Sequence, residues 1–257
     1  VRVHIKVNSG MNRLGFLPIE VNTVWEQLTS IKGVKVMGTV THFANAEWSY
    51  DAQKPVSVDK QLARMGYLAH SATAACMANS AGILWHPEVG GDGVRAGVAL
   101  YGVSPDSRIS SEELGLIPAM TLSAKIIAIQ QIPAGEAVGY GSRWRASRPS
   151  RIAVVACGYA DGYPRSMPDG APTWVEGAIA PLVGAVSMDM LEIDITDIPA
   201  AKLGSVVELW GKNLSVNKVA AACGTIGYEL ICALARRVPL KIVEAYKEAS
   251  THRKENE

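Results

Sequence analysis

The sequence lacks several features that would assign it to a class of protein at once. Its 25 basic side chains are offset by 24 acidic ones, and no basic block would follow a nucleic-acid backbone or a lipid surface. No apolar stretch approaches the roughly 18 residues of a membrane span, and no signal peptide is recognisable. We therefore expect no nucleic-acid or membrane partner, a cytoplasmic location, and a small neutral or zwitterionic ligand.

Cysteine is scarce and scattered. No C-x-x-C pair occurs, and no histidine stands at metal-ligand spacing from any of the four cysteines, Cys76, Cys157, Cys223 and Cys232. This pattern favours free thiols in a reducing compartment over disulfides or zinc, so no metal site is predicted. The rest of the composition is ordinary, because 257 residues that are 48% apolar suffice for one large domain or two smaller ones.

Two kinds of pattern divide the chain. Over residues 1–112, strand-like runs alternate with helix-like segments, which predicts parallel strands covered by helices. Residues 113–245 predict a mostly β domain with Pro and Gly turns, and residues 246–257 are charged and predicted to be disordered. In the first part the predicted strands are 1–7, 34–43, 82–85 and 94–100, and the predicted helices are 20–31 and 58–77. In the second part the predicted strands are 120–132, 137–141, 151–157, 172–186, 188–195 and 205–211, followed by two helices in 216–238 separated by Gly224.

Polar side chains follow many of the apolar runs, and chemistry in parallel α/β folds gathers where strands end. Each side chain alone has an ordinary reading: a structural histidine, a surface ion pair, a half-buried tyrosine or a turn-forming aspartate. The segments fit no phosphate-loop pattern. Together they form a candidate site of Asn8, Ser9, Gly10, Arg13, Thr41, His42, Asn79, Ser80, Arg95, Gly97, Tyr140, Tyr159, Asp161, Met188, Asp189 and Tyr228.

Seven segments carry a family resemblance. They are "HIKVNSGMNRLGF", "THFANAE", "RAGVALYG", "PAGEAVGYG", "GYADGYPR", "VSMDM" and "GTIGYELICALARRVP", which stand in the order in which alanine racemases carry their motifs. The resemblance extends from Val1 to about Val238. It implies an α/β plus β fold: the second half of a (β/α)8 TIM-like barrel, about strands 5 to 8, followed by a mostly β carboxyl-terminal domain. It also implies a pyridoxal 5'-phosphate enzyme that interconverts L-alanine and D-alanine for peptidoglycan.

The resemblance implies a role for each matched residue around the cofactor. Arg95 matches the arginine that faces the pyridine nitrogen, and His42 matches the histidine that hydrogen-bonds that arginine and the catalytic tyrosine. Ser80, the backbone of Gly97 and Val98, and Tyr228 match the phosphate site.

Roles toward the substrate follow in the same way. Tyr140 matches the tyrosine that serves as one of two bases from the neighbouring subunit of a homodimer. Arg13 matches the arginine near the phenolic oxygen and the substrate carboxylate, and Lys6 matches a lysine that some members carry as a carbamate. Met188 matches the residue whose amide receives the substrate carboxylate, and Tyr159 lies in the motif at the site entrance.

One departure from the family limits these expectations. The cofactor lysine of the family lies in a motif Lys-Ala-Asn-Ala-Tyr-Gly, and nothing in this sequence resembles it. About four βα units precede residue 112, where a closed barrel needs eight. We therefore expect the isolated chain to be inactive and to need an amino-terminal segment, which could be a separate chain, a second copy or an upstream sequence. Two alternatives stay open: a same-fold racemase or decarboxylase with another substrate, or a non-catalytic piece that binds phosphate or dimerises through its β domain.

Overall fold

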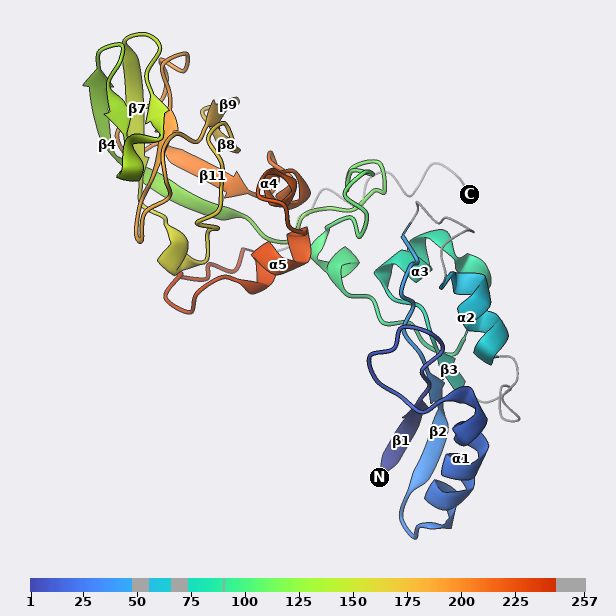
Figure 1. The fold of residues 1–257 in the computed structure, drawn as a ribbon. Helices are drawn as coiled ribbons and strands as arrows, with labels where there is room; N and C mark the ends of the chain where they lie inside the picture. The colour runs from blue at the N-terminus through green and yellow to red at the C-terminus, as the bar shows by residue number, and fades with distance from the viewer. Residues whose placement is uncertain (48–55, 66–73, 90, 244–257) are drawn as a thin grey trace, which may run out of the picture.

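The computed structural model describes residues 1–47, 56–65, 74–89 and 91–243. Figure 1 shows an α/β part and a β part at opposite ends of the molecule, joined by the segment that follows residue 97. The α/β part contains a parallel sheet in the order β1-β2-β3, formed by β1 (Arg2–Lys6), β2 (Lys35–Val40) and β3 (Ala74–Cys76). Its helices are α1 (Val21–Ser30), α2 (Val58–Met65) and α3 (Ser80–Trp85), with 3₁₀ helices η1 (Pro18–Glu20), η2 (Pro87–Val89) and η3 (Val98–Tyr101).

Helix α1 covers one face of this sheet because its apolar residues recur three and four positions apart. Val21, Val24 and Leu28 pack with Ile5 and Val7, which alternate along and just beyond β1 and are each 1% exposed. Met65 of α2 joins the same cluster. The first predicted strand and the predicted helix 20–31 are therefore confirmed.

The predicted strand 82–85 is wrong, because these residues belong to α3. Asn79 caps this helix, and its side-chain oxygen accepts the N–H of Gly82 at 2.9 Å. The apolar run therefore lies on a capped helix. The predicted helix 58–77 is also too long: α2 includes Met65, residues 66–73 lie outside the described residues, and Ala74–Cys76 is β3.

The predicted strand 94–100 is wrong for a different reason. The hydroxyl oxygen of Ser80 accepts the N–H groups of Gly97 and Ala99 at 2.8 and 3.3 Å, and the chain turns there into η3. The residues just before this turn do run beside β3. Arg95 donates its N–H to the carbonyl of Ala78 at 2.8 Å, and Gly93 forms an isolated parallel bridge with Cys76.

The β part is built on a six-stranded sheet in the order β10-β7-β4-β11-β8-β9. An antiparallel bridge between Leu182 and Ile193 connects its two ends, so the sheet curves back on itself. The strands are β4 (Leu122–Ile132), β7 (Ser150–Val155), β8 (Pro172–Val175), β9 (Ala178–Pro181), β10 (Leu191–Asp194) and β11 (Val206–Trp210), with a small hairpin of β5 (Ala137–Val138) and β6 (Trp144–Arg145).

Short helical segments complete the β part. They are η4 (Tyr140–Ser142), η5 (Tyr159–Asp161), α4 (Val216–Ala222) and α5 (Gly227–Cys232). Gly224 lies between the last two with a φ of 74°, so the predicted break is confirmed. The predicted strand 137–141 is too long, because Gly139 takes a φ of 71° and the chain turns into η4.

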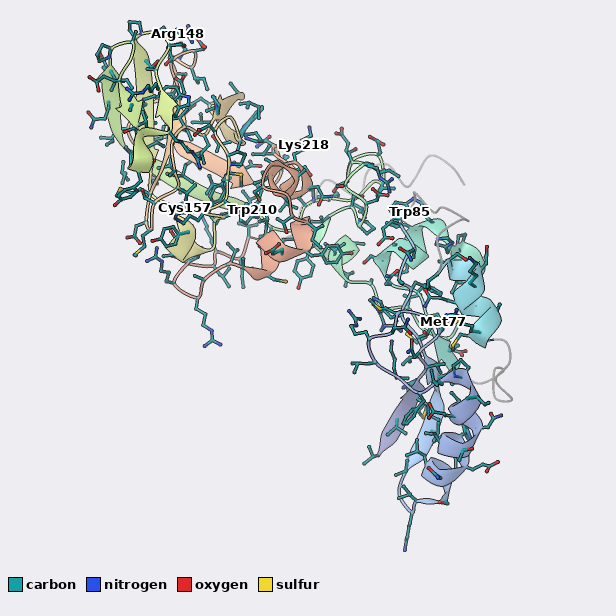
Figure 2. All side chains as sticks on the ribbon, in the orientation of Figure 1. Met77, Trp85, Arg148, Cys157, Trp210 and Lys218 are labelled. Atoms are coloured by element: carbon teal, nitrogen blue, oxygen red, sulfur yellow. The ribbon has the colours of Figure 1, made fainter. Side chains whose placement is uncertain are left out.

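The core of the β part includes a stacked pair of rings. The rings of Tyr163 and Trp210 lie 6.1 Å apart at 12°, and Cys157 is buried in the same core (Figure 2). Burial raises the pKa of the Cys157 thiol to about 12. Val98 from η3 also belongs to this core, which ties the joining segment to the β part. All four cysteines are free, and no described helix has the length and apolar character that a bilayer crossing requires.

Candidate functional site

Four cationic or titratable side chains gather where β1, β2 and β3 end. Lys6 is the last residue of β1, His42 follows β2, and Arg95 runs beside the end of β3. Arg13 comes from the loop after β1. A small cavity of about 10 Å³, room for about one water molecule, is lined by Lys6, Arg13 and His42 among others.

The loop after β1 is folded so that Arg13 lies near Lys6. Phe16 returns to the strand, donating its N–H to the carbonyl of Lys6 at 2.9 Å and accepting the N–H of Asn8 at 2.8 Å. Gly15 makes this return possible, because it has a φ of 116° and a Cβ there would lie 2.7 Å from the backbone nitrogen of Asn8.

Arg95 is held by backbone carbonyls. Its Nη2 donates to the carbonyl oxygens of Thr41 at 2.5 Å and Met77 at 3.3 Å. Its Nη1 donates to the carbonyl oxygen of Cys76 and, at 3.1 Å, to the Sγ of the same residue. A guanidinium has five N–H donors, so among the described residues the Nε–H of Arg95 is left for a ligand.

The cluster is electrostatically positive. The pKa of His42 is lowered by partial burial and by the charges of Arg95, Lys6 and Arg13, so its imidazole is neutral at pH 7. The pKa of Lys6 is lowered by partial burial and by Arg95 and Arg13. No carboxylate from the described part of the chain lines the cavity, and the described residues contain no cluster of three or more His, Cys, Asp or Glu side chains that could hold a metal. This arrangement suits an anionic ligand.

A buried glutamine that the sequence analysis did not single out organises the strand ends. Gln61 lies on α2, is 0% exposed, and donates from Nε2 to the Oγ of Ser9 at 2.8 Å and to the carbonyl of His42 at 3.0 Å. Its Oε1 accepts the N–H of Ala44 at 2.8 Å. The backbone from the carbonyl of His42 to Ala44 is therefore fixed.

The network continues to the neighbouring strand end. The hydroxyls of Ser9 and Thr41 lie 2.6 Å apart, and Thr41 donates to the carbonyl of Val7 at 3.0 Å. Arg64 of α2 donates to the carbonyl of Ser9 at 2.8 Å. The signal for Gln61 in the sequence is a polar residue at an apolar helix position, since Val58, three residues before it, is also buried.

The predicted phosphate-site residues lie at the start of α3 and η3. Ser80 is 2% exposed, and its hydroxyl oxygen accepts the N–H groups of Gly97 and Ala99, which leaves its O–H proton as a donor. Tyr228 lies at the start of α5, where partial burial and the carboxylate of Glu47 raise its pKa. No hydrogen bond between described residues joins Tyr228 to Ser80.

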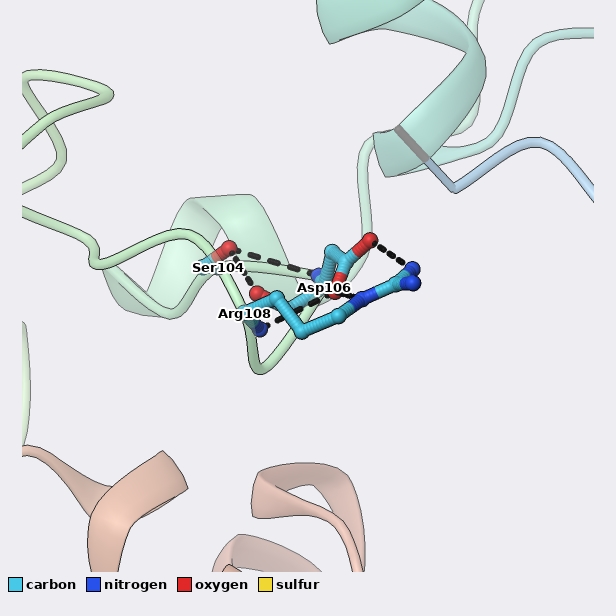
Figure 3. Close-up of polar contacts among 3 residues, drawn as sticks. All are labelled: Ser104, Asp106 and Arg108. Carbon is cyan, nitrogen blue, oxygen red and sulfur yellow. Dashed lines mark hydrogen bonds and ion pairs between the residues drawn. The ribbon is translucent and has the colours of Figure 1, made fainter. Parts of the chain in front are cut away.

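A cavity of about 350 Å³ adjoins Tyr228. One wall is formed by the loop 104–108, where the buried carboxylate of Asp106 accepts from the Nε of Arg108 at 2.9 Å and from its Nη2 at 2.6 Å (Figure 3). The hydroxyl of Ser104 donates to the carbonyl of Asp106 at 2.7 Å. The carbonyl of Ser104 also accepts from the Nδ2 of Asn217 on α4 at 2.9 Å, so this wall is held by its own contacts and by α4. No motif in the sequence predicts it.

Three of the predicted site residues on the β part, Tyr140, Tyr159 and Met188, lie on neighbouring segments. The N–H of Tyr159 donates to the carbonyl of Ser187 at 3.0 Å, next to Met188. The backbone before Tyr140 approaches the same segment, since a Cβ on Gly139 would lie 3.2 Å from the nitrogen of Ala185. The side chains of Tyr140, Tyr159 and Met188 are 73%, 39% and 54% exposed.

These three residues and the cation cluster do not form one site within a single chain. No hydrogen bond or ion pair among the described residues joins the two groups, and they belong to the two opposite ends of the molecule (Figure 1). Among the same residues, no hydrogen bond joins the His42 ring to Arg95. The roles that the resemblance implies for these residues therefore stay predictions.

Comparison with protein families gives two matches that follow one another along the chain. Residues 1–105 match the alanine racemase N-terminal domain family, and residues 119–242 match the alanine racemase C-terminal domain family. The residues between the matches, 106–118, belong to the segment that joins the α/β part to the β part.

Individual proteins are similar over the same range. The alanine racemase of Erwinia tasmaniensis is 50% identical over 240 residues, which cover 93% of this chain and 66% of that protein. The alanine racemase of Paraburkholderia phytofirmans is 47% identical over 94% of this chain and 67% of its own. The crystal structure of the biosynthetic alanine racemase from Pseudomonas aeruginosa superposes with a TM-score of 0.86 at 45% identity, over 93% of this chain and 66% of that one. The chain thus spans about two thirds of the length of its relatives.

Proposed function

Because the chain belongs to the alanine racemase family, we propose that it acts in the interconversion of L-alanine and D-alanine with pyridoxal 5'-phosphate. The observation that carries the proposal is the cation cluster of Lys6, Arg13, His42 and Arg95 at the strand ends, which no carboxylate lining the cavity neutralises within the described residues. Such a positive cluster suits anionic ligands. The cofactor supplies a phosphate and a phenolic oxygen, and the substrate supplies a carboxylate.

The donor chemistry of the site fits this cofactor. Ser80 has an O–H proton to donate to a phosphate oxygen, and Tyr228 adds a phenol at the start of α5. The N–H of Gly97 donates to the hydroxyl oxygen of Ser80, and the same contact places the N–H of Val98 beside Ser80 at the turn into η3. Phosphate binding by loops after the last strands is the usual arrangement in barrels of this kind. We assign Ser80, Gly97, Val98 and Tyr228 to the phosphate and Arg95 to the ring nitrogen.

The residues of the site then have different roles in binding and proton transfer. Pyridoxal phosphate, when bound, stabilises the negative charge left when the α-proton of an amino acid is removed. Arg95 keeps a permanent positive charge near the ring nitrogen and so disfavours protonation there. Arg13, supported by Lys6, and the amide of Met188 bind the substrate carboxylate. Tyr140 exchanges a proton on one face of the substrate, and Tyr159 lies at the entrance.

A tyrosine such as Tyr140 can act as a base only where nearby positive charge favours its ionised form. A phenol with a pKa of about 10 is mostly protonated at neutral pH, and a cationic neighbourhood lowers that pKa. The cluster of His42 and Arg95 is such a neighbourhood, but it lies at the other end of the same chain. We therefore propose a homodimer in which the β part of one subunit brings Tyr140, Tyr159 and Met188 to the α/β part of the other.

We extend the proposal to the fold of each part. Residues 1–112 would contribute strands 5 to 8 of a (β/α)8 barrel, and residues 113–245 the carboxyl-terminal domain. Two features of the structure support this: the parallel order β1-β2-β3, and the segment at Gly93, which lies beside β3 as a fourth strand would. The structural similarity to the Pseudomonas aeruginosa alanine racemase supports it as well. The predicted disordered tail, 246–257, lies outside the described residues. D-alanine supply for peptidoglycan in the cytoplasm belongs to the same proposal, and the four free thiols fit that compartment.

Two measurements on one preparation test the proposal. The protein is incubated with pyridoxal phosphate and L-alanine, and D-alanine is followed by chiral chromatography. Borohydride reduction and peptide mapping identify the lysine that carries the cofactor. D-alanine formation that is lost in Arg95→Ala supports the proposal. A preparation with one stoichiometrically labelled lysine that forms no D-alanine overturns it, and turnover of larger amino acids in proportion would assign another substrate.

A further inference from the structure

One arginine joins the two loops that carry Tyr159 and Met188. The Nε of Arg237 donates to the Oδ1 of Asp161 at 2.8 Å, and its Nη2 donates to the Oδ1 of Asp189 at 2.7 Å. Asp161 ends η5, two residues after Tyr159, and Asp189 directly follows Met188. A single guanidinium therefore bridges the entrance loop and the loop predicted to bind the substrate carboxylate.

The entrance loop is itself tied to the second loop through the backbone. Ala160 donates its N–H to the carbonyl of Met188 at 2.9 Å, and Gly158 is packed so closely that a Cβ would lie 2.4 Å from that same oxygen. The other carboxylate oxygen of Asp161, Oδ2, accepts the N–H of Gly158 at 2.9 Å. Asp161 therefore links the turn of its own loop to Arg237.

The segment that carries Arg237 is anchored on the same loop. Ala235 donates its N–H to the carbonyl of Asp161 at 3.0 Å. A Cβ on Gly162 would lie 2.3 Å from the carbonyl oxygen of Ala233, so the two segments are in close backbone contact. The backbone near Arg237 is thus anchored close to both carboxylates. The ion pairs of Arg237 therefore differ from an isolated surface ion pair, in which neither side chain is held in place.

Burial anchors the ends of the entrance loop, since Cys157 and Tyr163 lie in the core, but it does not hold Tyr159 and Met188 themselves, which are 39% and 54% exposed. The positions of these two residues therefore depend on the polar contacts just described. The charges matter as well. Asp189 carries a negative charge next to the residue whose amide is predicted to receive a carboxylate, and Arg237 neutralises that charge.

We propose that Arg237 is a positioning residue that bridges Asp161 and Asp189, keeps the Tyr159 and Met188 loops ordered, and cancels the repulsion between Asp189 and an incoming substrate carboxylate. This inference rests on the proposed function for its substrate but not for its effect on the loops. Arg236 serves as the matched control, because it is exposed and makes no hydrogen bond or ion pair with the other described residues.

Hydrogen exchange tests the effect on the loops without any enzymatic activity. In Arg237→Ala the amides of Gly158, Tyr159 and Ala160 should exchange about tenfold faster than in the parent protein. The reason is that the free energy of local opening of this loop is lower without the Arg237 contacts. Arg237→Lys, which keeps the charge but cannot bridge two carboxylates in the same way, should give an intermediate increase. Arg236→Ala should leave these amides unchanged. Unaltered exchange in Arg237→Ala overturns the positioning role.

Kinetics test the electrostatic part. In protein that racemises alanine, Arg237→Ala should raise KM about tenfold while kcat changes by less than about threefold, because the loss concerns carboxylate binding. Adding Asp189→Asn to Arg237→Ala should restore most of the KM, since the uncompensated charge is then gone. A KM that stays high in the double variant, or a loss confined to kcat, overturns the charge argument. Absence of racemase activity in a preparation that carries one stoichiometrically labelled cofactor lysine would refute the proposed function and leave the exchange experiment intact.

Discussion

The Nη2 of Arg95 donates to the carbonyl oxygen of Thr41 at 2.5 Å, which joins two residues 54 positions apart at the ends of neighbouring strands. The same guanidinium donates to the carbonyl of Cys76, so it connects the ends of β2 and β3. Arg95 therefore has a structural task as well as its proposed task toward the cofactor. Experiments on this residue need readouts for both.

Replacing Arg95 with Lys should show whether these two tasks require the guanidinium or only a positive charge. A lysine keeps the positive charge but cannot reach several carbonyls together, so kcat/KM should fall at least about 100-fold. The free energy of unfolding should fall by about 2 kcal/mol, because buried carbonyls lose their donor. Racemisation and denaturant unfolding measure the two effects. Arg145→Lys, on an exposed hairpin residue, is the control, and equal effects at both positions would contradict the account.

Replacing Gln61 with Leu should disorder the strand ends around His42. The N–H of Ala44 and the hydroxyl of Ser9 would lose a buried partner, which predicts a loss of about 2 to 3 kcal/mol in unfolding free energy. Thermal or urea unfolding checks this. Gln27→Leu on the exposed side of α1 should change stability by less than about 0.5 kcal/mol. A Gln61→Leu protein as stable as the parent would show that the network is not required.

The pH dependence of stability should carry a signature of His42. Its folded pKa lies below 6.5, because burial and the charges of Arg95, Lys6 and Arg13 oppose protonation. The unfolded state then binds more protons just below pH 6.5, so stability falls as the pH drops through that range toward the folded pKa. The His42→Gln variant should lose less stability than the parent between pH 7 and 5.5.

Anions should reverse this shift, because a negative charge in the cluster favours the protonated imidazole. Inorganic phosphate or pyridoxal phosphate should raise the pKa of His42, measured by NMR titration of its ring protons. A pKa that stays the same with saturating phosphate would argue against anion binding at this cluster.

Two inactive variants should restore activity when mixed, provided that the sites are shared between subunits. Tyr140→Phe damages the β part, and Arg95→Ala damages the α/β part. Random reassembly makes half of the dimers mixed, each with one intact site of two, so about a quarter of the parent activity should return. Mixed preparations that stay inactive despite proven subunit exchange would show that each site is built within one chain.

The sequence predicts most strands of the β part for a physical reason, but the predicted strand 172–186 is wrong, because positive φ values at Glu176 and Gly177 turn the chain between β8 and β9. Its strands alternate buried and exposed residues, as at Leu191 and Ile193, which are both 0% exposed, and Pro and Gly mark the turns between strands. Gly224 separates the last helices as predicted. These are local signals that need no knowledge of distant contacts.

The α/β part shows what local patterns miss. The apolar run 82–85 fits a buried strand or a helix equally well, and the Asn79 cap decides in favour of the helix. The turn at Gly97 depends on Ser80, which is distant in sequence. Gln61 stands at an apolar position of α2, and only its contact with the loop of His42 shows which groups it binds. The places of Arg13 and His42 after strand ends, in contrast, could be predicted, whereas Lys6 enters only through the family resemblance and Arg95 lies within the predicted strand 94–100.

The central claim is that these residues belong to an alanine racemase site, and a chimaera tests it most directly. The part of the Erwinia tasmaniensis alanine racemase that precedes the matched region is fused ahead of Val1, and D-alanine formed from L-alanine is measured by chiral chromatography. We predict racemisation that depends on pyridoxal phosphate and is abolished by Arg95→Ala but not by Arg236→Ala. A folded chimaera that binds pyridoxal phosphate stoichiometrically and forms no D-alanine would contradict the account.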